Sequence, residues 1–108
     1  MQQPFSYVWE FEVPSATVAE FQRHYGSGGS WVALFRRSPA YIETLLLRDR
    51  ARPERYLTID RWQSIEAYRA FREQFAEQYA ALDRACEGLS RCETDLGSFD
   101  ELAGQSGG

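Results

Sequence analysis

The stretch RYLTIDRWQSIEAYRAFREQFAEQYAAL, residues 55–82, decides the fold, because a two-residue alternation gives way within it to a helical period. Over residues 55–62 the alternation predicts a strand with apolar side chains on both faces. One face carries Leu57 and Ile59, and the other carries Tyr56, Thr58, Asp60 and Trp62. Ser64 then predicts the start of a helix, because its hydroxyl can accept a hydrogen bond from an unpaired N–H group of the first turn.

The helix that begins after Ser64 carries an aromatic stripe. Apolar residues recur at three- and four-residue steps on one side of it, and charged residues occupy the other side. The stripe consists of Ile65, Tyr68, Phe71, Phe75, Tyr79 and Leu82. We expect this side to pack on the sheet. The helical pattern runs on to Gly88, and we expect a bend near Phe75–Glu77.

The remaining segments complete an α+β pattern. Period-two alternation predicts strands over Phe5–Val13, Tyr41–Arg48 and, more weakly and at an edge, Leu89–Leu96. A first helix is expected to begin at Ser15 or at Thr17, the latter through a capping box with Glu20, and to end at Gly26. A short helical segment is expected over residues 30–35. The order strand, helix, strand, strand, helix, strand is that of ferredoxin-like folds.

The length of the chain predicts a single domain, over residues 1–102, with a flexible tail at 103–108 that is too small and polar to pack. The helices are expected on one face of the antiparallel sheet. The other face then exposes apolar side chains from several strands, which is uncommon on a monomer. We therefore expect a homodimer through this bare face of the sheet.

Composition excludes several classes of function. With 108 residues, a net charge of −4 and 15% aromatic residues, the chain has no clustered positive charge for nucleic acid or an anionic membrane. All twelve basic residues are arginine, so lysine Schiff-base chemistry is excluded. There is one histidine and no ligand set at metal spacing, so we expect no metal site. Cys86 and Cys92 are expected to be reduced thiols, and no secretory leader or membrane span is evident, which predicts a cytoplasmic protein.

The residue types leave few candidates for chemistry. His24 falls in the last turn of the first helix, where it can be structural or a proton acceptor. Asp60 shares a strand face with Trp62, and it is either solvated, paired with Arg48 or Arg61 across the sheet, or part of the chemistry. The tryptophans can belong to the core or to a site.

The run Trp62-Gln63-Ser64-Ile65-Glu66-Ala67-Tyr68 resembles the antibiotic biosynthesis monooxygenase family of dimeric α+β barrels. In that family the third strand ends in Trp, a Ser caps the second helix and a Tyr follows in its first turn. Pro39-Ala40-Tyr41, which opens the second strand, is similar to the family's Pro-Gly-aromatic sequence. The resemblance spans Phe5–Phe99 and includes the order of the elements.

The resemblance implies an oxidoreductase that oxidises a phenol, anthrone or hydroquinone with O₂, without metal, flavin or any other cofactor. In the quinone-forming members an Asn four residues before the Trp, the Trp and the Tyr line the pocket. Trp62 and Tyr68 match, but Thr58 stands at the Asn position and offers a hydroxyl in place of an amide. Haem-degrading members need a histidine on the second helix, and residues 65–88 contain none.

By this resemblance, Trp62 stacks on the substrate, Tyr68 and Thr58 hydrogen-bond its oxygens, and Asp60 or His24 accepts the proton. The further residues expected around the substrate are Trp9, Trp31, Tyr41, Phe71 and Phe75. The alternative is a dimer without catalytic activity, which binds a small aromatic molecule or serves as a structural α+β barrel, because one fold hosts many functions.

Overall fold

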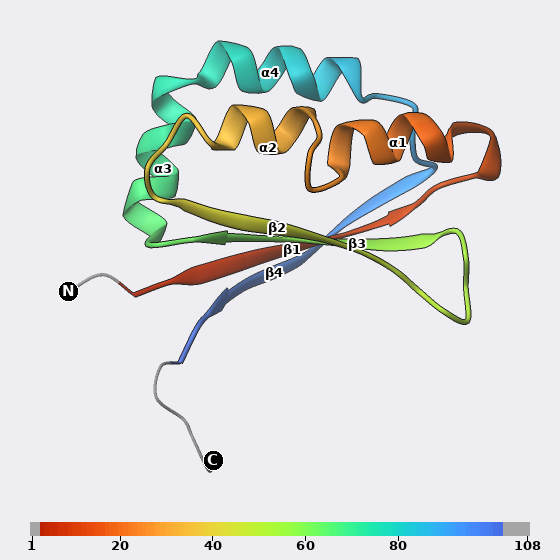
Figure 1. Cartoon of the computed structure of the whole chain (residues 1–108), viewed down its shortest axis with the longest axis horizontal. Helices are drawn as coiled ribbons and strands as arrows, with labels where there is room; N and C mark the ends of the chain where they lie inside the picture. The colour runs from red at the N-terminus through yellow and green to blue at the C-terminus, as the bar shows by residue number, and fades with distance from the viewer. Residues whose placement is uncertain (1–2, 103–108) are drawn as a thin grey trace.

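Four antiparallel strands form one sheet, and the helices lie on one side of it, in the computed structural model, which describes residues 3–102 (Figure 1). The elements in chain order are β1 (Phe5–Glu12), the short turn η1 (Ser15–Thr17), α1 (Val18–Tyr25), α2 (Ser30–Phe35), β2 (Tyr41–Arg48), β3 (Arg55–Trp62), α3 (Ile65–Gln74), α4 (Ala76–Ala85) and β4 (Cys92–Asp100). The strand order β2-β3-β1-β4 confirms the predicted ferredoxin-like fold. The tail at 103–108 lies outside the described residues.

Strand β3 occupies a central position and has the bounds that its alternation predicts. The four residues of its inner face are buried under the helices: Tyr56, Thr58, Asp60 and Trp62. In the antiparallel register, Asp60 lies opposite Tyr7 on β1 and opposite Thr44 on β2. The strand therefore places a carboxyl group between two hydroxyl-bearing neighbours in the middle of the covered face.

The predicted helix after β3 is divided into α3 and α4. Ser64 caps α3 as predicted, since its Oγ accepts a hydrogen bond from the N–H of Ala67 at 3.0 Å. The expected bend is at Phe75, whose φ and ψ are −111° and 30°. Because of this bend, α4 lies over α2 (Figure 1), and the Tyr79 ring packs 4.8 Å from that of Trp31.

Two local predictions are wrong. Thr17 does not form a capping box with Glu20: its hydroxyl donates to the carbonyl of Leu89 at 2.7 Å, which ties the start of α1 to the loop before β4. Strand β4 begins at Cys92 and not at Leu89. The sequence pattern misplaced its start because nearly all of its side chains are exposed, so burial does not impose an alternation on them. Gly97, at φ 116°, lies at a bulge where the pairing of β4 with β1 shifts.

The outer face of the sheet exposes apolar side chains, as predicted. Val8, Leu45, Leu57 and Ile59 point to this face by the strand register, and Leu47 and Phe99 are 45% and 54% exposed. Ion pairs surround these side chains: Arg61 with Glu43 and Glu101, and Arg55 with Glu10 and Asp49. The structure contains a single chain, so the predicted dimer through this face stays a prediction.

Two smaller expectations concern the cysteines and the membrane. Cys86 is buried, Cys92 is exposed, and both thiols are free. Over residues 3–102, none of the helices has both the length and the apolar character needed to cross a membrane.

A candidate active site between the sheet and the helices

A cavity of about 270 Å³ lies between the inner face of the sheet and the helices. Its walls are mainly aromatic and include Trp9 on β1, Tyr25 on α1, Trp31 and Phe35 on α2 and Tyr79 on α4. Its floor is polar, with Thr44, Thr58 and Asp60 from β2 and β3. Three charged residues, Arg72, Asp83 and Glu93, line it where it meets solvent. A concave apolar site with a few polar groups is typical of small-molecule binding.

Asp60 is the buried acid of this cavity, with 6% of its surface exposed. Thr44 Oγ1 donates a hydrogen bond to Asp60 Oδ1 at 2.5 Å, and the Tyr41 hydroxyl lies 2.7 Å from the same Thr44 oxygen. Asp60 is therefore not solvated, and the alternative that it pairs with Arg48 or Arg61 is also wrong. Strand alternation sends the Arg61 side chain to the opposite face, where it binds Glu43 and Glu101, and Arg48 forms no ion pair with a described residue.

Burial raises the pKa of Asp60 from its ordinary value of 3.8 to about 6, although the hydrogen bond from the Thr44 hydroxyl partly opposes this rise. The ionised form is disfavoured because a carboxylate loses its hydration when it is buried without a cation. A carboxyl group that titrates near neutral pH can accept a proton as a general base. Perturbed acids of this kind are concentrated in functional sites.

Two buried donors in the cavity wall lack partners. Tyr7 Oη and Trp31 Nε1 form no hydrogen bond with the described residues, and both side chains line the cavity. Burial, and next the nearby Asp60, raise the pKa of Tyr7 well above its ordinary value, so its hydroxyl stays protonated. Unpaired buried donors are rare in proteins and mark places where a ligand or water supplies the acceptor.

The structure brings together four of the residues that the sequence singled out. Trp9, Trp31, Thr58 and Asp60 line the cavity, and Thr58 lies opposite Trp9 across the β1–β3 pairing. The other six do not line it: His24, Tyr41, Trp62, Tyr68, Phe71 and Phe75.

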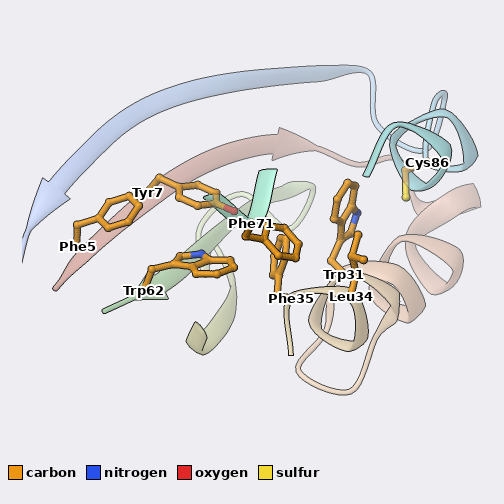
Figure 2. Packing of buried hydrophobic residues seen from close by; sticks show 8 residues of the cluster. All are labelled: Phe5, Tyr7, Trp31, Leu34, Phe35, Trp62, Phe71 and Cys86. Carbon is orange, nitrogen blue, oxygen red and sulfur yellow. The ribbon is translucent and has the colours of Figure 1, made fainter. Parts of the chain in front are cut away.

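Trp62 belongs to the core and does not form a stacking surface. Its side chain is fully buried, with ring centroids 5.5 Å from Phe35 and 5.1 Å from Phe71 (Figure 2). It shares the inner face of β3 with Asp60, but α2 and α3 cover this end of the strand with aromatic rings. The Tyr68 ring packs 5.2 Å from Trp62, and its hydroxyl accepts a hydrogen bond from Arg72 at 3.0 Å.

His24 lies outside the cavity, near the end of α1. Its Nδ1 is 2.9 Å from Ser30 Oγ, and its Nε2 is 3.5 Å from a carboxylate oxygen of Glu20. These contacts join α1 to the start of α2. The geometry therefore favours Asp60 over His24 as the proton acceptor.

Sequence reasoning missed several residues of the cavity. Tyr7 could have been found, because the antiparallel pairing of the first and third strands places it opposite Asp60. Arg72 and Glu93 carried no such signal. Arg72 falls on the charged side of its helix. Glu93 lies near the start of β4, the strand whose bounds the sequence pattern misplaced.

The sequence matches no protein-family model and no curated protein. Among solved structures, the fold matches SnoaB, a cofactor-independent oxygenase from Streptomyces nogalater. A point variant of SnoaB has a TM-score of 0.76 at 25% identity over 94% of this chain and 96% of that chain. A second SnoaB structure has a TM-score of 0.69 at 23% identity over 95% and 97%.

A candidate antibiotic biosynthesis monooxygenase from Bordetella bronchiseptica shares the fold more distantly in sequence. Its TM-score is 0.74 at 14% identity, over 94% of this chain and 99% of that chain. These matches confirm, at the level of fold, the resemblance that residues 62–68 indicated.

Proposed function

Because the chain has the fold of the antibiotic biosynthesis monooxygenases, we propose that it is a cofactor-independent monooxygenase that oxidises a phenol-, anthrone- or hydroquinone-type aromatic molecule with O₂. One observation carries this proposal: the buried acid Asp60, with no cation beside it among the described residues, forms the floor of an aromatic cavity. Deprotonating the substrate is the step that the protein must perform, since the substrate supplies the electrons.

In the proposed reaction, ionised Asp60 accepts a proton from the substrate, as a general base does. For an anthrone or a phenol with a free para position, the resulting anion reduces O₂ and forms a carbon–oxygen bond, which gives a hydroperoxide. The hydroperoxide loses water and becomes the quinone. One oxygen atom of O₂ enters the product and the other leaves as water, so no external reductant is required.

The other cavity residues bind and orient the substrate. Trp9 and Trp31 offer aromatic faces, while Tyr7 Oη and Trp31 Nε1 are donors that a substrate oxygen can satisfy. Thr58 adds a hydroxyl beside Asp60. A volume of about 270 Å³ is just below the usual range for ligand pockets, which favours a flat aromatic molecule that is smaller than a typical drug.

The proposal is tested by O₂ uptake with metal-free protein and a panel of anthrones, phenols and hydroquinones. We expect at least one member of the panel to be oxidised, and Asp60→Asn to lower kcat by about 10²–10⁴, the usual contribution of a general base. Asp100→Asn, at an exposed position of β4, is the matched control and keeps the activity.

The same experiment separates the enzyme from a binding protein. Quenching of tryptophan fluorescence by members of the panel without O₂ uptake, in wild-type protein, overturns the oxygenase and leaves the alternative of a non-catalytic aromatic-binding protein. Uptake that Asp60→Asn does not change removes Asp60 as the base.

We also propose that two copies pair through the outer face of the sheet, as in a dimeric α+β barrel. The exposed Leu45, Leu47 and Phe99 within a frame of ion pairs support this, because patches of this kind mark association sites. Sedimentation at micromolar concentration is expected to give a dimer. Leu45→Glu gives a monomer, whereas Ala33→Glu, at an exposed position on α2, leaves the dimer intact. A monomeric wild-type protein contradicts this proposal.

A further inference from the structure

Arg72 is the one arginine among the described residues that lines the main cavity. Its guanidinium lies over the Tyr79 ring, 3.8 Å from the centroid, and its Nη1 donates to the Tyr68 hydroxyl at 3.0 Å. A cation over an aromatic face is attracted by the negative face of the ring. Rings from α3 and α4 therefore hold the charged group in place at the wall of the cavity.

No carboxylate pairs with Arg72 within residues 3–102. By contrast, four other arginines form ion pairs: Arg23, Arg55, Arg61 and Arg91. A guanidinium has five N–H groups, and the Tyr68 hydroxyl accepts from only one of its nitrogens. The remaining N–H groups can donate to a bound anion, and the planar fork of arginine suits oxygen anions.

The charges of the cavity are arranged unevenly along β1. Arg72 lies at the Tyr7 end, since its partner Tyr68 packs 4.9 Å from the Tyr7 ring. Glu93 lies opposite Phe11 on β1. Phe11 is four residues beyond Tyr7, or about 13 Å along the strand at 3.3 Å per residue. Asp83 also lines the cavity and is close enough for its charge to add to the rise in the pKa of Glu93 that partial burial causes, so two acidic groups stand near this end. Asp60 also lies at the Tyr7 end, opposite Tyr7 on the neighbouring strand. An anionic group is thus attracted to the Tyr7 end when Asp60 is protonated, and it is repelled from the Glu93 end.

We propose that Arg72 binds the oxygen anion of the substrate, and that the substrate is an aromatic molecule that carries a phenolate, enolate or carboxylate oxygen at the Tyr7 end of the cavity. The inference rests on the proposed function for the reaction, but anion binding itself needs no turnover. Thr58 stands where the related enzymes have an Asn, and its hydroxyl cannot supply the two N–H donors of an amide. The guanidinium of Arg72, on α3, supplies such a pair of donors instead.

The proposal is tested by comparing 2-naphthoate with its neutral counterpart 2-naphthamide. Affinities are measured at pH 5.5 by tryptophan fluorescence, with isothermal calorimetry as a second readout. At this pH an aromatic carboxylate is ionised and Asp60 is mainly protonated. The complex therefore resembles the state after proton transfer, with a neutral acid and an anionic ligand.

We expect wild-type protein to bind the naphthoate at least tenfold more tightly than the amide, the scale of a hydrogen bond to a charged group. Arg72→Gln abolishes this preference and leaves the affinity for the amide within about twofold. Arg72→Lys keeps the charge and part of the preference. Arg69→Gln is the control, because this arginine is exposed on the same helix and does not line the cavity.

Equal affinities for the two ligands in wild-type protein, or equal losses for both ligands in Arg72→Gln, overturn the role of Arg72. If Arg72→Gln does not fold, the wild-type comparison and Arg72→Lys still decide the question. An Arg72-dependent preference without O₂ uptake supports the anion site and removes the proposed reaction, whereas O₂ uptake without the preference does the reverse.

Discussion

Replacing Asp60 with asparagine is expected to stabilise the folded protein at neutral pH, although it removes the proposed base. The folded protein raises the pKa of Asp60 from 3.8 to about 6, so folding disfavours the ionised carboxyl group. The asparagine keeps an oxygen that can accept the hydrogen bond from Thr44, but it has no charge to bury. A gain in stability with a loss of activity is typical of a residue that is kept for function.

The magnitude follows from the linkage between proton binding and folding. Below pH 3.8 the carboxyl group is protonated in both states and there is no penalty. Between pH 3.8 and 6 the unfolded chain ionises first, so the penalty grows, and above pH 6 it is complete. At 1.36 kcal/mol per pKa unit, the penalty is about 1 kcal/mol at pH 4.5 and about 3 kcal/mol at pH 7.5.

Urea unfolding at pH 4.5, 6 and 7.5 measures this effect, at one protein concentration because a dimer makes stability depend on concentration. The difference in unfolding free energy between Asp60→Asn and wild type is expected to shift in favour of the variant by about 2 kcal/mol from pH 4.5 to 7.5. Asp100→Asn, on the exposed edge strand, is measured at the same three pH values as the control for the loss of one carboxyl group. If the difference for Asp60→Asn is independent of pH, the carboxyl group is not perturbed and the argument for a buried base fails.

Three further predictions concern the residues around this acid and its strand. Thr44→Val removes the donor that lowers the pKa of Asp60, so the acid limb of the kcat/KM profile moves up by about one pH unit, and an unchanged limb contradicts the hydrogen bond. Ser64→Ala removes the cap of α3 and lowers the unfolding free energy by about 1 kcal/mol in urea titrations, whereas no loss shows that the cap contributes nothing. Trp62→Ala empties a fully buried position and lowers the unfolding free energy by about 3–5 kcal/mol, so a loss below 1 kcal/mol excludes a core role.

The strands that could be predicted residue for residue are those with one covered face. In β3 the alternation of Tyr56, Thr58, Asp60 and Trp62 with outward-facing residues is the direct result of that cover. Strand β4 pairs with β1 at the edge and buries almost nothing, so backbone hydrogen bonds alone set its bounds. A sequence pattern does not record such bonds. The hydroxyl of Thr17 likewise bonds across 72 residues, and no local motif predicts this.

Which side chains of the inner sheet face line the cavity could not be predicted from the strands alone. Alternation places Asp60 and Trp62 on the same face, but whether each reaches the cavity depends on what the helices put above it. Rings of Phe35 and Phe71 cover Trp62, while the floor around Asp60 stays open. Arg72 falls on the charged side of its helix by periodicity. Its long side chain nevertheless reaches the cavity wall over Tyr79, which depends on the bend at Phe75.

The most direct test of the central claim is the fate of oxygen during turnover. Metal-free protein is incubated under ¹⁸O₂ with an anthrone, or a phenol with a free para position, that the protein oxidises. The quinone is analysed by mass spectrometry while kcat/KM is followed from pH 5 to 8. We predict one ¹⁸O atom per quinone, a rate that rises with pH through about 6 as Asp60 ionises, and loss of both signals in Asp60→Asn. Unlabelled product, or a labelled product formed equally well by Asp60→Asn, contradicts the account.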